Sequence, residues 1–323
     1  MPERATVSLT GDTPLISVVV CTYNRAALLG GAITSLAQQT LDRSLYEILV
    51  VDNNSTDETP ETVRRLQESH PDATIRYLTE TRQGLGYARN TGVQHSRADY
   101  VAFLDDDAQA PPGYLARAVG LFEEVQPTPW VVGGPIHPFY PTPKPTWFRD
   151  AYEIRTWGPA CRFLAPGEWF SGSNMVFRRE LIERFGGFAT DKGMAGSTLS
   201  VGEETALFER MWQSPQRTLL YYCPDLIVHH AVPKAKMRPG YHVRRHFAHG
   251  NGCDESPRSD LAARCQCLLG DCIAGAKCGW YVLRLLPGIR HPNQFVVECL
   301  GPLAYELGRL ARHLGIRLTV RQR

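Results

Sequence analysis

The stretch Asp99-Tyr-Val-Ala-Phe-Leu-Asp-Asp-Asp-Ala108 joins a short apolar run to three consecutive carboxylates. Residues 100–104 are uncharged and rich in strand formers, which is typical of a strand buried on both faces of a parallel sheet. In open α/β sheets, ligands bind beyond the carboxyl ends of the strands. The sequence therefore predicts a ligand site at Asp105, Asp106 and Asp107.

The three adjacent carboxylates repel one another by roughly 1–4 kcal/mol per close pair, depending on the local dielectric. A hard divalent cation with oxygen ligands relieves such repulsion. A solvated acidic turn or a helix N-cap explains the same residues without a metal, so the triplet alone leaves both interpretations open.

Strands and helices alternate through the residues before this stretch. Apolar runs predict strands over residues 16–21, 46–51, 74–78 and 100–104, and periodic or capped segments predict helices over 26–39, 59–69 and 84–96. Each strand–helix–strand repeat closes as a right-handed crossover, so we expect a doubly wound, mostly parallel α/β sheet.

Polar residues follow the carboxyl ends of three of these strands, and such ends share one edge of a parallel sheet. They are Thr22, Tyr23 and Asn24, then Asp52, and then Asp105 to Asp107. This pattern predicts a nucleotide crevice. No G-x-G-x-x-G follows the first strand and no G-x-x-x-x-G-K-[ST] occurs, so we expect neither a dinucleotide fingerprint nor a P-loop.

The second half of the chain is less regular. Residues 126–149 are rich in proline and aromatic residues and predict an ordered but irregular connection. Further on, we expect strands over 175–177, 219–222 and 226–229, a short helix over 178–185, and a helix that opens at residue 202. Basic helical segments follow His230 to the end.

Charge is spread unevenly over the 323 residues. Residues 234–323 hold 15 Lys+Arg and 6 Asp+Glu, or +9, whereas the remainder holds 20 and 27, or −7. We expect a leader over 1–14, one large domain over 15–232, and a basic, mainly helical extension over 233–323. The extension is either a packed helical subdomain or an interfacial surface that contacts a membrane through residues 234–323.

The lack of a visible targeting signal and the irregular spacing of the cysteines predict a cytoplasmic location. No signal peptide or spanning segment is visible, and nine cysteines without framework spacing predict reduced thiols. Five late cysteines are either a zinc site or helix thiols: Cys253, Cys265, Cys267, Cys272 and Cys278. We expect a cytoplasmic protein, peripheral on the inner membrane face if the extension docks, with no nucleic-acid partner.

Seven motifs occur in a fixed order over residues 15–232. They are SVVVCTYNR, VVDNNSTD, ARNTG, FLDDD, SGSNMVFRR, GGF and GEET. The set resembles glycosyltransferase family 2, whose fold is GT-A. The resemblance implies an inverting transferase that uses a nucleotide-diphosphate sugar, most often a UDP-sugar, with Mn²⁺ or Mg²⁺, and a glycan, lipid-linked or small-molecule acceptor.

The resemblance also assigns roles to individual residues. It implies that Thr22, Tyr23, Asn24, Asp52 and Arg89 lie at the nucleotide, with Asp52 accepting from uracil. Asp107 matches the principal metal ligand, and Asp105 or Asp106 holds the ribose or metal-bound water. Trp169, Gly172 and Asn174 line the acceptor side. Turn chemistry at Thr22 and Tyr23 and helix capping at Asp52 are the structural alternatives.

The family usually carries Glu-Asp where this chain has Glu203-Glu204, so Glu204 matches the general base. A helix N-terminus keeps a carboxylate ionised, whereas burial or Glu203 raises its pKa, and the sequence leaves open which effect wins. Two solvated first-turn charges are the structural alternative. A histidine at 229 or 230 completes the metal shell, with His229 preferred, or packs under the extension.

Two other functions fit the same scaffold. A GT-A protein that has lost turnover would still bind a nucleotide sugar without transferring it. A nucleotidyltransferase is disfavoured because the first strand lacks a glycine-rich phosphate loop with a basic residue. Metal-dependent release of nucleotide from a sugar donor separates the transferase from both.

Overall fold

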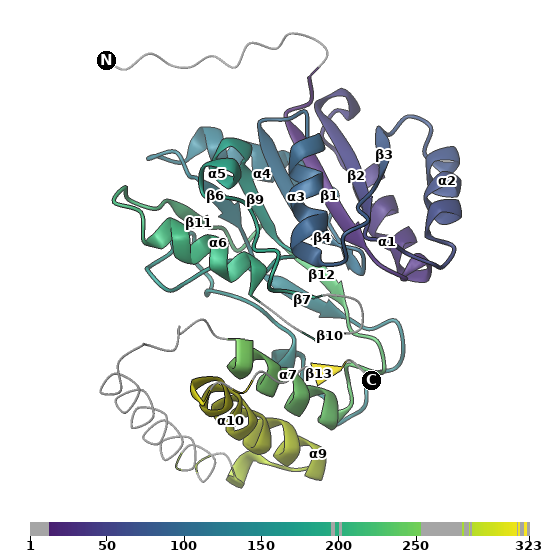
Figure 1. Cartoon of the computed structure of the whole chain (residues 1–323). Coiled ribbons are helices and arrows are strands. Elements are labelled where there is room, and N and C mark those ends of the chain that lie inside the picture. The colour runs from purple at the N-terminus through teal and green to yellow at the C-terminus, as the bar shows by residue number, and fades with distance from the viewer. Residues whose placement is uncertain are drawn as a thin grey trace.

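The computed structural model describes residues 13–194, 198–199, 202–252, 280, 284, 286–314, 316 and 320–321. An eight-stranded sheet forms its centre (Figure 1), in the order β3-β2-β1-β4-β9-β6-β11-β8. These strands are β1 (Ile16–Thr22), β2 (Tyr46–Asp52), β3 (Ile75–Thr79), β4 (Tyr100–Asp105), β6 (Val131–Gly133), β8 (Arg162–Phe163), β9 (Met175–Arg178) and β11 (Leu220–Tyr222). Strands β1 to β4 pair in parallel, as do β6 and β11, whereas β9 and β8 are antiparallel to their neighbours. The predicted GT-A-like, mostly parallel α/β sheet is confirmed.

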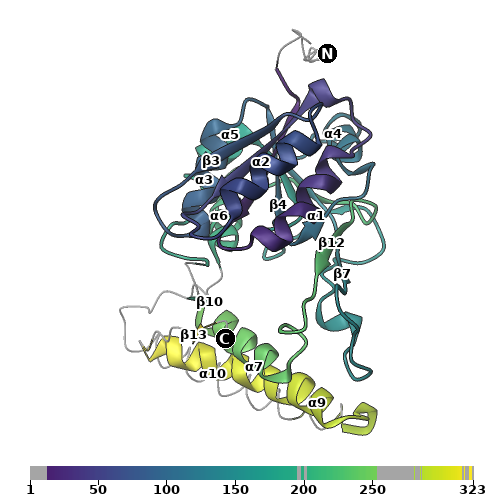
Figure 2. The same ribbon diagram turned by 90° about the vertical axis from the view of Figure 1, so that its right-hand side faces the viewer.

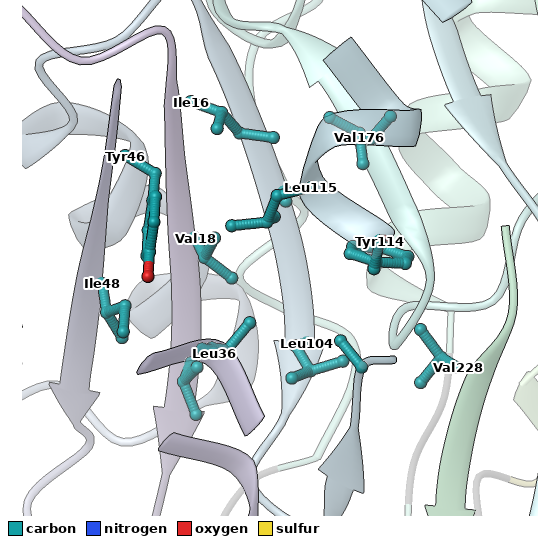
Figure 3. Packing of buried hydrophobic residues seen from close by; sticks show 14 of the residues in the cluster. Ile16, Val18, Leu36, Tyr46, Ile48, Leu104, Tyr114, Leu115, Val176 and Val228 are labelled. Carbon is teal, nitrogen blue, oxygen red and sulfur yellow. The ribbon is translucent and has the colours of Figure 1, made fainter. Parts of the chain in front are cut away.

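Helices cover both faces of this sheet. One face carries α1 (Ala26–Ala37), α2 (Thr59–Ser69) and α4 (Tyr114–Glu124), and the other carries α3 (Leu85–His95), α5 (Arg179–Arg184) and α6 (Glu203–Trp212). Because side chains alternate along a strand, Val18 and Val20 enter the first core and Val19 the second. Figure 3 shows Val18 beside Leu36 of α1 and Leu115 of α4. The unbroken apolar strands thus serve two cores.

A small second sheet forms where the sequence predicts an irregular connection. Within residues 126–149, β6 joins the main sheet and β7 (Ile136–Phe139) pairs with β12 (Val228–Ala231). Strand β12 also pairs with β5 (Ala108–Gln109), which follows the aspartates. Strand β7 tolerates Pro138 because it is an edge strand. These strands are too short for periodicity to reveal them, and helix α4 was not predicted either.

The C-terminal helices form a separate layer beside the small sheet (Figures 1 and 2). They are α7 (Pro239–Gly252), α9 (Pro292–Phe295), a π-helical turn (Val296–Leu300) and α10 (Gly301–His313). Helices α7 and α10 approach closely at glycines, because a Cβ on Gly250 would lie 2.0 Å from the Tyr305 carbonyl oxygen. The helical extension is confirmed, whereas its boundary at residue 232 stays a prediction.

Shorter elements complete the described chain. They are the 3₁₀ turns Arg43–Leu45, Asp150–Tyr152 and Leu286–Gly288, and the paired strands β10 (Thr198–Leu199) and β13 (Val320–Arg321). None of the described helices combines the length and apolar character that crossing a lipid bilayer requires. Most of the leader and the five late cysteines lie outside the described residues.

Candidate active site

The register of the central strands brings the predicted polar residues to one edge of the sheet. Thr22 at the end of β1 pairs with Asp52 at the end of β2, and Cys21 pairs with Asp105 at the end of β4. Asp106 and Asp107 form the turn into β5. The three strand ends therefore meet, as the strand–helix repeat predicts.

The three aspartates differ in their partners. Asp106 accepts hydrogen bonds from Thr22 Oγ1 at 2.8 Å and from Arg25 at 2.6 Å. Asp107 is paired with Arg25 at 3.1 Å and with Lys236 Nζ at 3.3 Å. Asp105 is the least buried, with 36% of its side chain exposed. Asp106 and Asp107 are thus buried and paired with basic side chains, whereas Asp105 lines a cavity.

These partners set the charge of each carboxyl group. Burial raises the pKa of Asp106 to about 6, although Arg25 opposes the rise. Burial alone would raise the pKa of Asp107 too, but the charges of Lys236, His230 and Arg25 hold it well below the ordinary value. Asp107 is therefore the more firmly ionised of this pair, which suits a cation ligand.

Asp105, Asp107 and His230 form a group whose ligand atoms lie within 4.8 Å of one another. His230 Nε2 is 3.1 Å from Asp107 Oδ1 and 3.5 Å from Asp105 Oδ2. Pairing of β12 with β5 sets His230 opposite Ala108, which brings the ring to the aspartates. This group is the structural form of the predicted aspartate site.

His229, the preferred histidine of the sequence prediction, does not face this group. Successive strand residues point to opposite faces, so His229 in β12 turns away from the aspartates. Its ring centroid lies 6.3 Å from that of His137, and its side chain is exposed. The sequence offered the pair His229-His230, and only the strand register decides between its members.

The group suits a divalent cation. Two carboxylates and an imidazole are donors that Mn²⁺ accepts, and carboxylates also suit Mg²⁺. The close polar neighbour of the buried Asp107 Oδ1 is His230 Nε2, at 3.1 Å, and the two make no well-aligned hydrogen bond. The donor set of two carboxylates and an imidazole therefore fits a divalent cation.

Arg89 ties the aspartate edge to helix α6. Its guanidinium is 2.7 Å from Glu203 Oε1, 3.7 Å from Glu204 Oε2 and 3.9 Å from Asp105 Oδ1, and it is buried. A Cβ on Gly172 would lie 2.1 Å from Arg89 Nη2, so only glycine leaves room for this arginine. Arg89, predicted to touch the nucleotide, thus organises the carboxylates.

Glu203 and Glu204 begin α6 but have different surroundings. Glu203 is buried and pairs with Arg89. Burial raises the pKa of Glu204 to about 8, Glu203 adds to the rise, and Arg89 opposes it. Glu204 Oε2 has no hydrogen-bond partner among the described residues. The effect of burial on the Glu204 pKa is therefore larger than the opposite effect of the helix N-terminus, and the pKa is raised.

These side chains line one cavity of about 250 Å³, which we call the acidic cavity. It is defined by Arg89, Asp105, Glu203, Glu204 and His230. Glu204 thus opens into the same space as two members of the cation group. An ionisable base and a cation site in one enclosure can act on the same substrate.

The predicted nucleotide residues divide into structural and exposed ones. Asp52 is 2% exposed, and its oxygens accept from the Ser55 backbone N–H at 2.9 Å and the Tyr77 hydroxyl at 2.6 Å. Asn24 Oδ1 accepts from the Thr56 backbone N–H at 2.7 Å. Asp52 therefore bonds within the turn after β2 and caps no helix, since α2 begins at Thr59, whereas Tyr23 remains half-buried.

The predicted acceptor residues lie in three different settings. Gly172 lines the acidic cavity beneath Arg89. Asn174 is fully buried, donates to the Pro135 and Leu226 carbonyls, and accepts from Tyr114. Trp169 is 39% exposed and is not among the residues that line the acidic cavity. Asn174 is placed to hold β9 against the small sheet and cannot contact a substrate there.

The sequence missed two basic residues that contact the aspartates. Arg25 ends the motif Thr-Tyr-Asn-Arg and pairs with Asp106 and Asp107. Its position directly after the first strand was a usable signal. Lys236 reaches Asp107 from the segment before α7, and no local pattern marks it.

The mostly parallel sheet, with helices on both faces and polar residues at one edge, is the architecture of a GT-A type α/β scaffold. The family model for glycosyl transferase family 2 matches residues 17–186. The chain belongs to glycosyl transferase family 2. The resemblance that the motifs carried is therefore confirmed.

Individual relatives agree with this family. The chain is 28% identical over 216 residues to a glucosyl-dolichyl phosphate glucuronosyltransferase of Haloferax volcanii, covering 64% of this chain and 66% of that protein. A mannosyltransferase of Pyrobaculum calidifontis, solved with GDP-Man and Mn²⁺, superposes with a TM-score of 0.62 at 25% identity, covering 94% and 87% of the two chains.

A third comparison supports the fold alone. TarS 1–349 of S. aureus, solved with UDP-GlcNAc, superposes with a TM-score of 0.55 at 16% identity, covering 94% of this chain and 92% of that one. The chain matches less than two thirds of the length of the first curated relatives, with shares of 66%, 43% and 29%.

Proposed function

We propose that this protein transfers a sugar from a nucleotide-diphosphate donor to an acceptor hydroxyl with inversion at the sugar carbon. Inversion by single displacement requires the hydroxyl to lose its proton as it attacks. Glu204 is the base, because its carboxyl group lies in the acidic cavity, lacks a hydrogen-bond partner among the described residues, and has a pKa near 8. Glu203 and Arg89 position it.

Asp105, Asp107 and His230 are the residues that would hold Mn²⁺ or Mg²⁺. A divalent ion bound there would supply charge neutralisation for the departing diphosphate. Arg25 and Lys236 place further positive charge on the aspartates. Tyr23, which is half-buried, is the nucleotide contact in this proposal, while Thr22, Asn24 and Asp52 shape its loop.

One observation carries the proposal: Glu204 lines the same cavity as Asp105 and His230 of the cation group, and Arg89 lies between Glu204 and Asp105. A UDP-sugar is the donor that the family motifs favour, and GDP-mannose is the alternative that the solved mannosyltransferase suggests. The named relative from Haloferax acts with a glucosyl-dolichyl phosphate, which favours a lipid-linked acceptor.

Metal-dependent release of nucleotide tests the proposal. The full-length protein is incubated with a panel of UDP- and GDP-sugars, with Mn²⁺, with Mg²⁺ and with EDTA. We expect release with one donor, and loss of that release with EDTA and in Asp107→Asn. Thermal stabilisation by nucleotide and Mn²⁺ without release from any donor would instead support the non-catalytic alternative.

We also infer that the C-terminal layer contacts an anionic lipid surface. Leu300, Leu307 and Leu314 are spaced by seven residues along the π-helical turn and α10, and they are 40%, 58% and 59% exposed. The surrounding extension carries an excess of nine positive charges, 15 against 6. Apolar residues beside basic ones favour an interfacial position. Vesicle co-sedimentation that does not increase with anionic lipid would contradict this inference.

A further inference from the structure

A second cavity of about 670 Å³ lies beside the acidic cavity, and we call it the basic cavity. Its walls are the 149–155 segment, α7, and the chain from the π-helical turn into α10. Arg155, Arg245 and His249 line both cavities, so the two spaces adjoin there. Figure 2 shows the chain after β7 descending to the helical layer that closes this cavity.

Positive charge exceeds negative charge around the basic cavity. Arg149 is paired with Glu298 at 3.0 Å, and Arg245 is paired with Glu153 at 2.7 Å. Arg155 has no ion-pair partner within the described ranges, where its guanidinium donates only to the Tyr152 and Ile154 carbonyls. One arginine of the wall therefore lacks a counter-charge, and its side chain remains accessible.

The titration of neighbouring groups indicates the same excess. Desolvation and the Arg245 charge lower the pKa of Arg155 despite its accessible side. Burial and Arg245 also lower the pKa of His242 and of His249 to about 4, so both rings are neutral at pH 7. The pKa values of these three groups are therefore all lowered by a region of positive potential.

His242 adds a polar atom without a partner. Its side chain is fully buried, and its Nε2 has no hydrogen bond within the described chain. The nearest carboxylate oxygen, from Glu153, is 3.9 Å away, beyond hydrogen-bond range. His242 therefore contributes a neutral, buried ring to the wall of the cavity.

Part of the remaining wall is apolar. Ala151, Val297 and Pro302 contribute hydrocarbon surface, and Tyr152 adds a ring whose hydroxyl is already bonded to Glu298. The volume exceeds what a simple inorganic anion fills. The cavity therefore combines a guanidinium end next to the acidic cavity with an apolar side against α10.

We propose that the basic cavity binds the phosphate group of an amphiphilic acceptor, with Arg155 pairing with the phosphate and the apolar part lying against Val297 and Pro302. This inference rests on the proposed transferase function. Guanidinium groups suit phosphate because their planar donors match its oxygens. The acceptor's reacting end would enter the acidic cavity past the side chains that both cavities share.

Calorimetric binding to the full-length protein tests this proposal, with EDTA present so that metal-held phosphate makes no contribution. The probes are farnesyl phosphate, farnesol and inorganic phosphate. We expect farnesyl phosphate to bind at least about tenfold more tightly than either of the others, because it alone satisfies both ends of the cavity. Equal affinity for inorganic phosphate would assign the cavity to a free anion, and equal affinity for farnesol would remove the role of phosphate. Either result overturns the proposal.

Substitutions of Arg155 test whether farnesyl phosphate binds in the basic cavity. Arg155→Gln should weaken farnesyl phosphate about tenfold, whereas Arg155→Lys keeps the charge and part of the affinity. Arg64→Gln is the matched control, since Arg64 lies on α2 and is 64% exposed. Unchanged affinity in Arg155→Gln would place the phosphate elsewhere and refute the assignment.

Acceptor-independent nucleotide release separates this proposal from the transferase proposal. This release is measured on the unsubstituted protein, because Arg155 lines the acidic cavity as well as the basic one. If no donor is hydrolysed but farnesyl phosphate still binds through Arg155, the transferase function fails and the phosphate site stands. If donors are hydrolysed but Arg155→Gln still binds farnesyl phosphate normally, the transferase function stands and the phosphate site fails.

Discussion

The acidic cavity and the basic cavity adjoin, yet they neutralise charge in opposite ways. In the acidic cavity, buried Arg89 contacts carboxylates from β4 and α6 within 4 Å. In the basic cavity, Arg245 and Arg149 have carboxylate partners and Arg155 has none in the described chain. The carboxylates of the acidic cavity thus gather around one buried arginine, whereas the basic cavity has an excess of positive charge.

The two cavities therefore suit different ligands. The aspartate group beside the acidic cavity suits a cation, and burial keeps the Glu204 carboxyl group partly protonated. The basic cavity suits an anion. The carboxylates of the acidic cavity come from β4 and α6 and are paired with a buried arginine, whereas Arg155 lies in a loop without a carboxylate partner in the described chain. Substitutions in the acidic cavity should therefore change activity and stability more than substitutions in the basic cavity.

Glu204→Gln should have the largest effect. Glutamine keeps the size of the side chain but cannot accept the acceptor proton, so kcat should fall by about 10²–10⁴. Steady-state kinetics with the donor found in the panel measure this loss, and nucleotide binding with Mn²⁺ should persist. Glu209→Gln on the same helix is the control, and an equal loss there would exclude a special role for Glu204.

Arg89→Gln should have the next largest effect, on stability. Removing one partner of a buried ion pair leaves Glu203 unpaired and typically costs about 3–5 kcal/mol. Urea unfolding measures the free energy change. Arg64→Gln should change it by less than about 1 kcal/mol, because that pair with Glu68 is exposed. A small change in Arg89→Gln would mean that the acidic cavity tolerates unpaired carboxylates.

The pH profile should show a smaller effect with a defined direction. Glu204 must be ionised to act as a base, so activity should fall about tenfold per unit as pH drops below about 8. Its folded pKa exceeds the ordinary 4.5, so the folded state binds the proton more tightly, and its stabilising contribution declines as pH rises from about 4.5 to about 8. Glu204→Gln should abolish both dependences; an unchanged stability slope would contradict the assignment.

Arg155→Gln should have the smallest effect on stability. It removes a charge that Arg245 repels and that has no carboxylate partner in the described chain, so the unfolding free energy should stay within about 0.5 kcal/mol. Thermal or urea unfolding without phosphate checks this. A loss comparable to that of Arg89→Gln would show that Arg155 is structural and would remove the contrast between the cavities.

The fold was predictable where the sequence is periodic. Strands β1 to β4 and helices α1 to α3 lie within two residues of their predicted limits, because each pairs an apolar run with turn or cap chemistry. Strands β6 and β7 were not predictable, since segments of three or four residues carry too few positions to show an alternation. Their partners are distant in sequence, and β7 contains a proline.

The candidate site was predictable where a local sequence pattern marks its residues. The positions of Asp105 and Asp107 follow from the end of a buried strand, and Glu204 follows from a family motif at a helix start. The choice of His230 over His229 required the strand register, and Asn174 required the hydrogen bonds that bury it. Residue type therefore identified the chemistry, whereas contact partners assigned the roles.

The sequence by itself determined the alternating α/β architecture, the edge at which polar side chains gather, and the family. Local apolar periodicity and short motifs carry that information, since they act between near neighbours in the chain. Tertiary structure alone decided which way the Glu204 pKa shifts, which histidine faces the aspartates, and that a basic cavity adjoins the acidic one. Burial and charge pairing between residues distant in sequence control these properties, so no local pattern encodes them.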